Sequence, residues 1–385
     1  MLSRLAGRML LLALVLYVLG RFASPALAGW VTCAAVAPGL MISPLAGAFL
    51  DRIGSASAVT VDMIASTVLI ALLVAADQLG WVNPVVLLIL VGLFSLTSPL
   101  STAGIRVLLP RLVPVEALDR ANALDTAIHA AADVLGPALT GLIVAFAGPA
   151  PALTLIALTF GMAAVCIARV RLVPNVAPSS GSLLHHTLEG VRVVMRHPTL
   201  RGLAVSYILY QVAWGILVIA VPVFMVRTFA NGAGETMTGF LWAATGIAGG
   251  LGALLAGQLR TAGRERPIMA AGMLATALAA WSIAAELGSP GLVLGLLMAG
   301  FAEGPIDVGL LTLRQRRTDP ALLGRVLSVS ISLNTAGFPL GSAFAGMLIT
   351  RSLSVTFLVA GVIAALAALA VRLVPTETHE GPCRT

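Results

Sequence analysis

The fold is decided by one short polar stretch, Gly47-Ala-Phe-Leu-Asp51-Arg52-Ile-Gly54, which interrupts a strongly apolar sequence. The stretch lies between two apolar runs, at 27–50 and 59–76. Each run is long enough, or nearly so, to cross the roughly 30 Å hydrocarbon core of a bilayer as a helix. The sequence therefore predicts a tight polar turn at a membrane face. Gly47 permits close approach of a neighbouring helix, and Gly54 permits a turn that a side chain would strain.

The composition of the whole chain also indicates a membrane protein. Hydrophobic residues make up 59% of the 385 residues and charged residues 10%, whereas soluble domains carry about a quarter charged residues. All 23 basic residues are arginines. Because the arginines lie between apolar runs, they fit the positive-inside rule better than nucleic-acid binding. We expect the lipid bilayer as a partner and no nucleic acid.

Twelve apolar runs are predicted to form transmembrane helices. The first, which is short, is either a retained helix or a secretory signal with Arg4 and Arg8 ahead of it and Ala26-Leu-Ala28 as its cleavage site. The internal repeat described below favours a retained helix. The runs lie at about 2–20, 27–50, 59–76, 85–108, 122–147, 151–170, 202–226, 237–258, 267–287, 291–313, 325–350 and 353–373.

The arginines also predict the topology. With a cytoplasmic N-terminus, only Arg21, Arg227 and Arg351 fall on the outer side, and the other 20 arginines fall on or near the cytoplasmic side. We therefore expect a multi-pass protein of the cytoplasmic membrane with both termini in the cytoplasm.

The organisation expected from these runs is an N-terminal six-helix bundle at 1–173, a cytoplasmic linker at 174–200 and a C-terminal six-helix bundle at 201–385. The linker contains an amphipathic pattern that suits a helix on the membrane face. Its apolar side is formed by Leu184, Leu188, Val191 and Met195, and its polar side by Arg192 and Arg196.

An internal repeat relates the two predicted bundles. Glycines at 29, 39 and 47 precede glycines at 239, 249 and 257 by 210 positions, and Pro99 precedes Pro305 by 206. Gly136 and Gly141 precede Gly341 and Gly346 by 205. Such a pattern is typical of parallel repeats related by an axis along the membrane normal, with the substrate path between them.

The pattern G-x-x-x-D-R-x-G between the second and third helices resembles a loop of the major facilitator superfamily. That resemblance implies that Asp51, with Gly47, Arg52 and Gly54, forms a gating loop in which the aspartate caps a helix of the opposite half. Leu109-Pro-Arg-Leu-Val-Pro114 and Leu135-Gly-Pro-Ala-Leu-Thr-Gly141 resemble the branch of enterobactin exporters and macrolide efflux pumps. Within the latter, Gly136, Pro137 and Gly141 resemble a worn antiporter motif, which implies a bend in the fifth helix.

Ionisable residues inside the predicted helices are candidates for proton binding, because each costs on the order of 3 kcal/mol at mid-bilayer. The fifth helix carries Asp125, His129 and Asp133 at i, i+4 and i+8, and the tenth carries Glu303 and Asp307 at i and i+4. Structural hydrogen bonding is the alternative, and we expect it for Asp125. For His129 both readings stay open, because a neutral histidine can also hydrogen-bond to Asp133. Glu303 is the first candidate for the proton site and Asp133 the second.

Aromatic residues form a second candidate site. They either line a substrate surface or anchor helices at the membrane interface, and the sequence leaves both readings open. The residues are Tyr207, Tyr210, Gln211 and Trp214 in the seventh helix and Trp242 in the eighth.

Known catalytic motifs are missing from the sequence, including G-x-S-x-G, H-E-x-x-H and a phosphate loop with lysine. Three cysteines show no metal or redox spacing, so we expect no metal and no cofactor. The predicted function is that of a monomeric, proton-coupled exporter of small amphipathic molecules of drug, macrolide or siderophore type. Two alternatives are a non-transporting sensor or remnant of the same fold and an intramembrane hydrolase that uses Glu303 and Asp307.

Overall fold

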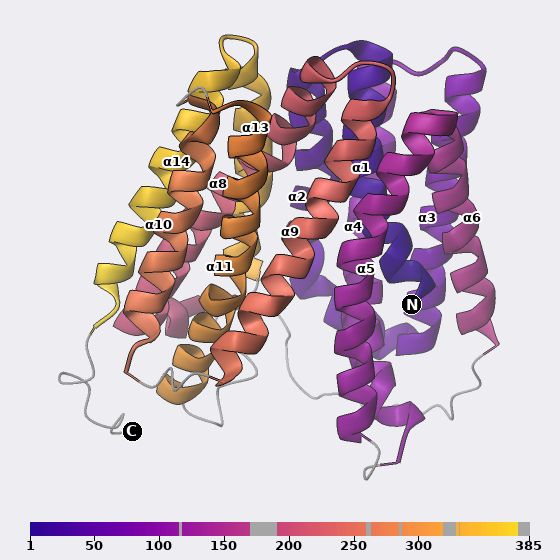
Figure 1. The fold of residues 1–385 in the computed structure, drawn as a ribbon. Helices are drawn as coiled ribbons and strands as arrows, with labels where there is room; N and C mark the ends of the chain where they lie inside the picture. The colour runs from indigo at the N-terminus through magenta and orange to yellow at the C-terminus, as the bar shows by residue number, and fades with distance from the viewer. Residues whose placement is uncertain are drawn as a thin grey trace. The chain divides into compact units, whose positions relative to one another are not determined.

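A computed structural model describes residues 1–114, 118–169, 191–258, 263–284, 287–318, 329–330 and 332–375. Figure 1 shows a protein built of long helices. The first six are α1 (Leu2–Phe22), α2 (Pro25–Ile53), α3 (Ser55–Gln78), α4 (Pro84–Leu112), α5 (Leu118–Ala147) and α6 (Pro149–Ala168). The later ones are α8 (Pro198–Thr228), α9 (Ala233–Gln258), α10 (Glu265–Ala284), α11 (Gly288–Arg317), α13 (Gly337–Ile349) and α14 (Leu353–Ala370), followed by the 3-10 turn η2 (Val371–Leu373).

Local sequence explains several helix boundaries. The Asn83 side chain accepts hydrogen bonds from the backbone N–H groups of Val85 and Val86, both at 3.0 Å, and Pro84 occupies the first position of α4. Ser352 caps α14 in the same way through the N–H of Val355. Asparagine and serine are preferred helix caps, and proline fits the first turn because its missing N–H would be unpaired there.

Ten helices within the described residues are long and apolar enough to cross a membrane. They include α1, which was expected to be short. It runs to Phe22 and, with 21 residues, reaches about 30 Å. The prediction of an all-α membrane protein is therefore confirmed. Of the other described helices, α13 is too short to span by itself, and α10 begins with Glu265 and Arg266.

The turn predicted around Asp51 is shorter than the sequence suggested. α2 continues to Ile53, α3 begins at Ser55, and only Gly54 separates them, with a φ of 81°. That left-handed conformation favours glycine. Gly47, Asp51 and Arg52 consequently lie in the last two turns of α2 and not in a loop.

Two compact units make up the chain. The first comprises Met1–Leu184 and Pro222–Ala243, so that it includes the end of α8 and the start of α9. In it α1 lies against α2, α5 and α6, and α3 lies against α4 and α6. In this unit α1 is buried from Leu12 to Val18.

The second unit comprises His185–Val221 and Ala244–Thr385. In it α10 lies against α11 and α14. Residues 191–196 of the predicted linker are helical, and Val194 is fully buried beside Leu200 and Ala204. Met195, expected on the apolar side of this segment, is 54% exposed. Leu184 and Leu188 lie outside the described residues.

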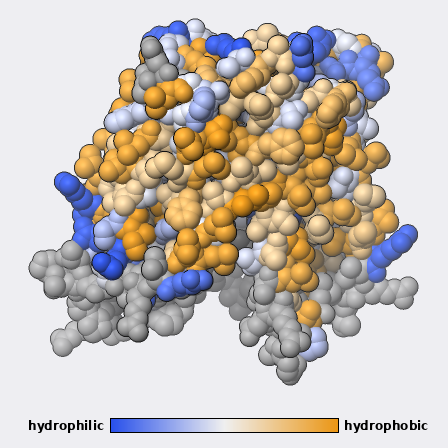
Figure 2. All heavy atoms as spheres, in the orientation of Figure 1, coloured by the Kyte–Doolittle hydropathy of each residue, from blue (hydrophilic) through white to orange (hydrophobic). Residues whose placement is uncertain are grey.

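The surface has the apolar character that lipid contact requires. Figure 2 shows apolar side chains over the helices and hydrophilic side chains gathered near helix ends. Leu158 and Leu294, for example, are 60% and 64% exposed. Exposed apolar surface of this extent marks contact with another apolar phase.

Candidate functional site

Two acidic residues lie inside the spanning part of α11. Glu303 is close to the middle of the span Gly288–Arg314, and Asp307 follows one turn later. Glu303 is half-buried and Asp307 is exposed. A carboxylate at this depth is expensive unless it is solvated, hydrogen-bonded or protonated, so the pair is the strongest candidate for chemistry in the second unit.

Asp307 has a hydrogen-bond donor from another helix. The hydroxyl of Tyr207 in α8 donates to Oδ1 of Asp307 at 2.5 Å. This distance is typical of a hydroxyl bonded to a carboxylate, which is among the stronger hydrogen bonds in proteins. The side chain of Tyr207 is only 9% exposed. The bond therefore joins a buried tyrosine to an accessible acid.

The aromatic residues of α8 form a continuous row behind this bond. The rings of Tyr207 and Tyr210 have centroids 5.7 Å apart, and those of Tyr210 and Trp214 are 6.4 Å apart, both edge to face. The Tyr210 hydroxyl lies 3.3 Å from Oγ1 of Thr276 in α10. Since all three rings are buried, they hold α8 in place and offer no open substrate surface in this conformation. Gln211 is half-buried beside them.

Arg314 was not singled out from the sequence, although it belongs to the same helix. It lies two turns beyond Asp307, is only 4% exposed, and its charge acts on Asp307. The pattern i, i+4, i+11 from Glu303 through Asp307 to Arg314 places all three on one stripe of α11. This spacing is the feature of the sequence that relates Arg314 to the two acids. From its position near a helix end, Arg314 is otherwise interpreted as one of the arginines that set the topology.

In the first unit, two arginines of α1 form ion pairs with two aspartates of α5. Arg4 binds Asp125 at 2.7 Å, and Arg8 forms an ion pair with Asp133. His129 is exposed, and the described contacts pair Asp133 with Arg8 and not with the histidine. The signal in the sequence for this contact is the i, i+4 spacing of Arg4 and Arg8, which places both arginines on one face of α1.

The expected bend residues of α5 lie at helix crossings. A Cβ on Gly136 would lie 2.7 Å from Cβ of Arg8 in α1. A Cβ on Gly141 would lie 2.6 Å from the carbonyl oxygen of Glu235 and 2.9 Å from Cα of Gly239, both in the part of α9 that belongs to the first unit. Pro137 lies inside α5 between these crossings.

The remaining candidates belong to the first unit. Trp242 belongs to the first unit, where it contacts a cluster formed by Leu12, Leu16, Val144 and Ala152. In the predicted gating loop, Arg52 is exposed, whereas the burial of Gly47 and the side chain of Asp51 lie outside the described part.

A second tyrosine–aspartate pair occurs at a helix end. The Tyr17 hydroxyl in α1 donates to Oδ1 of Asp77 at 2.7 Å, and Nε of Arg21 lies 3.4 Å from the same oxygen. Asp77 is in the last turn of α3, so this pair repeats the chemistry of Tyr207 and Asp307 away from the membrane centre. Among the described residues, no group of three or more His, Cys, Asp or Glu side chains is placed to hold a metal.

Comparison with known proteins gives consistent results. A family model described as Major Facilitator Superfamily matches residues 1–205 and 203–383. The uncharacterized MFS-type transporter y4rN of Sinorhizobium fredii (strain NBRC 101917 / NGR234) is 57% identical over 376 residues, covering 98% of this chain and 93% of the relative. The multidrug efflux pump Tap of Mycolicibacterium fortuitum is 28% identical over 341 residues, covering 85% of this chain and 82% of that protein. The crystal structure of the nucleoside transporter NupG superposes with a TM-score of 0.78 at 14% identity, covering 96% of each chain.

Proposed function

The chain belongs to the major facilitator superfamily, and on that premise we propose that it is a proton-coupled exporter of small amphipathic molecules. The family and the fold agree with what the sequence predicted. Export, the substrate class and proton coupling are the proposal. The single observation that carries it is the accessible Asp307 carboxylate inside a membrane-spanning helix, hydrogen-bonded to Tyr207 and one turn from Glu303.

The proposed direction of transport and the proposed substrate class are based on a related protein. Tap is named a multidrug efflux pump, and its similarity to this chain extends over most of both sequences. The stretch at 109–114 resembles exporters as well.

Proton coupling follows from the chemistry of the acid pair. Two carboxyl groups one turn apart on a helix lie close enough for like charges to oppose simultaneous ionisation. We propose that this pair carries the coupling proton. The Tyr207 hydroxyl stabilises the ionised Asp307 as an acceptor, and proton uptake weakens that bond between α8 and α11. The protonation state thereby acts on the contact between two helices.

The energetics of this coupling are adequate. One proton moving through 100 mV releases about 2.3 kcal/mol, and each pH unit adds about 1.4 kcal/mol. Because 1.4 kcal/mol corresponds to a tenfold concentration ratio, one proton sustains a gradient of roughly a few hundredfold.

The test is transport by the purified protein in proteoliposomes with an imposed pH gradient. Ethidium and a macrolide serve as probes, and we expect uphill movement that a protonophore abolishes. Glu303→Gln or Asp307→Asn should reduce uphill transport at least tenfold and leave substrate counterflow intact, because counterflow needs no net proton movement.

Asp77→Asn is the matched control, since it removes an aspartate bonded to a tyrosine at a helix end. That variant should keep uphill transport. Transport that the protonophore leaves unchanged, or equal losses in Asp77→Asn and Asp307→Asn, would refute the role of the acid pair. Cleavage of a membrane peptide in place of transport would favour the hydrolase alternative.

A further inference from the structure

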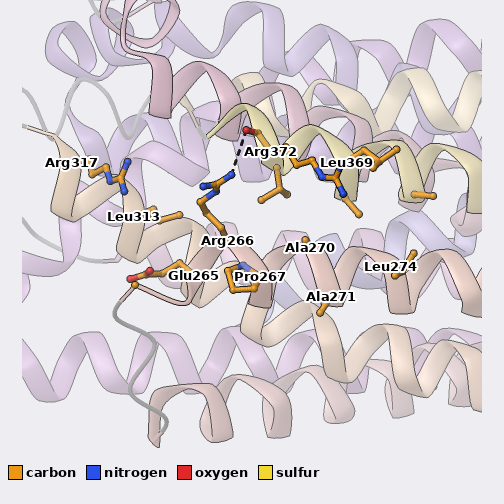
Figure 3. A pocket seen from close by; sticks show the side chains of 14 residues that line it. Glu265, Arg266, Pro267, Ala270, Ala271, Leu274, Leu313, Arg317, Leu369 and Arg372 are labelled. Carbon is orange, nitrogen blue, oxygen red and sulfur yellow. Dashed lines mark hydrogen bonds between the residues drawn. The ribbon is translucent and has the colours of Figure 1, made fainter. Parts of the chain in front are cut away.

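A cavity of about 710 Å³ lies in the second unit, at the arginine-rich ends of three helices (Figure 3). Its walls come from the start of α10, the end of α11 and the end of α14 with η2. The acid pair of α11 is not among the lining residues. The cavity is therefore separate from the candidate proton site.

The lining is divided into a basic and an apolar part. The basic part consists of Arg266, Arg317 and Arg372, which come from α10, α11 and η2. The apolar part follows α10 and α14 towards the middle of those helices, as Figure 3 shows for the labelled side chains. It includes Ala270, Ala271, Leu274, Leu313, Ala365, Ala368 and Leu369.

Two of these arginines, Arg266 and Arg372, are not neutralised by nearby acids in the part of the chain that the structure describes. Glu265 is the one acidic side chain in the lining, and Oε1 of Glu265 accepts from Arg316 at 2.6 Å while the residue is 2% exposed. Neither Arg266 nor Arg372 forms an ion pair among the described residues. Arg266 donates a long hydrogen bond, 3.4 Å, to the carbonyl oxygen of Arg372, and its buried Nε has no partner among the residues that the structure describes.

We propose that this cavity binds an anionic phospholipid, with the phosphate between Arg266 and Arg372 and an acyl chain along the apolar groove of α10 and α14. Guanidinium groups match phosphate oxygens in geometry and charge. Basic pockets between transmembrane helices are suited to anionic headgroups. The apolar groove distinguishes a lipid from a soluble phosphate, because only a lipid fills both parts of the lining. The site is independent of the transport activity proposed above.

Native mass spectrometry of the full-length protein tests this site. The protein is reconstituted in vesicles of phosphatidylcholine and phosphatidylglycerol at three to one and then released into mild detergent. We expect the wild-type chain to retain one phosphatidylglycerol in preference to phosphatidylcholine. The double variant Arg266→Gln/Arg372→Gln should lower that retention roughly 25-fold, on the order of fivefold for each arginine.

The control is Arg201→Gln/Arg264→Gln, which removes the same charge from two exposed arginines of the same unit that do not line the cavity. This control should retain the lipid. Equal losses in both double variants would overturn the site and leave only a general attraction of positive charge to anionic lipid.

A second measurement distinguishes loss of the lipid site from misfolding of the variant. Phosphatidylglycerol should raise the thermal unfolding temperature of the wild-type protein and of the control, and should not raise that of the Arg266/Arg372 variant. Stabilisation by soluble glycerol phosphate alone would overturn the lipid assignment. Lipid binding that appears only after Glu377→Gln/Glu380→Gln would show that the acidic C-terminal residues of the chain are the natural occupant.

Discussion

At the residue scale, the depth of a carboxylate in the membrane separates two pairs with the same chemistry. Tyr207 with Asp307 and Tyr17 with Asp77 are both tyrosine–aspartate hydrogen bonds between helices. Asp77 lies at the end of α3 and also has Arg21 near it, so its charge is easily accommodated. Asp307 lies within the span of α11, where charge is costly. The second case is the one we associate with proton transfer.

The ion pairs between α1 and α5 give a prediction about stability. Arg8→Gln and Asp133→Asn should each destabilise the protein, because each leaves a charge without its partner. Both side chains are partly exposed, 51% and 39%, so the coupling energy between the two substitutions should be only about 1 kcal/mol. A double-mutant cycle measured by equilibrium unfolding in mixed micelles provides this value.

The comparison for that cycle is Arg4→Gln with Asp125→Asn. The Arg4 side chain is 14% exposed, and Arg4 makes two hydrogen bonds to Asp125. We expect the larger coupling there. A coupling near zero at both pairs would mean that these contacts do not hold α1 against α5.

At the element scale, the internal repeat predicted from glycine spacing corresponds to equivalent helix crossings. The N–H of Gly39 donates to the hydroxyl of Ser95 where α2 meets α4, and Gly249 meets Gly300 where α9 meets α11. Gly136 approaches α1, and Gly341 approaches Val212 of α8. The sequence could predict these crossings because a close approach between helices requires small residues.

Other parts of the site could not be predicted in this way. The pairing of Arg8 with Asp133 and the bond from Tyr207 to Asp307 join residues more than 95 positions apart. Spacing along one helix shows which residues share a face, but not which neighbouring helix that face meets. For that reason the sequence does not predict which acidic residues the arginines of α1 and α11 meet. The burial of Tyr210 likewise depends on α10, which supplies Thr276.

The crossing of α5 and α9 gives a prediction about two glycines of one helix. Gly239→Ala should destabilise the protein, because the added Cβ would lie 2.5 Å from the carbonyl oxygen of Pro137. Gly250→Ala is the control, since nothing lies within 4 Å of its added Cβ. That substitution should be neutral or stabilising by up to about 1 kcal/mol, the helix preference of alanine over glycine.

Thermal unfolding in detergent measures both glycine variants. We expect the unfolding temperature of Gly239→Ala to fall below that of the wild-type protein and that of Gly250→Ala to match or exceed it. If both variants behaved alike, Gly239 would have no special role in the crossing.

At the scale of the whole molecule, the arginine distribution predicts how the protein lies in the membrane. With Cys33, Cys166 and Cys383 replaced by serine, a new cysteine at Ser180 should resist an impermeant thiol reagent in intact cells and react after permeabilisation. Ala230→Cys, an exposed position in the turn between α8 and α9, should react in intact cells. The reverse labelling pattern would invert the topology and place most arginines outside.

The single-residue connection at Gly54 has a mechanical consequence. The two Cα–Cα steps from Ile53 through Gly54 to Ser55 span at most about 7 Å, and sliding by one helical turn would add 5.4 Å to the distance that they bridge. The joint therefore has almost no slack, and α2 cannot slide by a full turn past α3 unless one of the two helices unwinds. The two lengths next to the joint that can unwind are the first turn of α3 and the final turn of α2, and the latter carries Asp51 and Arg52. An axial pull between the two helices therefore acts directly on the turn of α2 that carries Asp51 and Arg52.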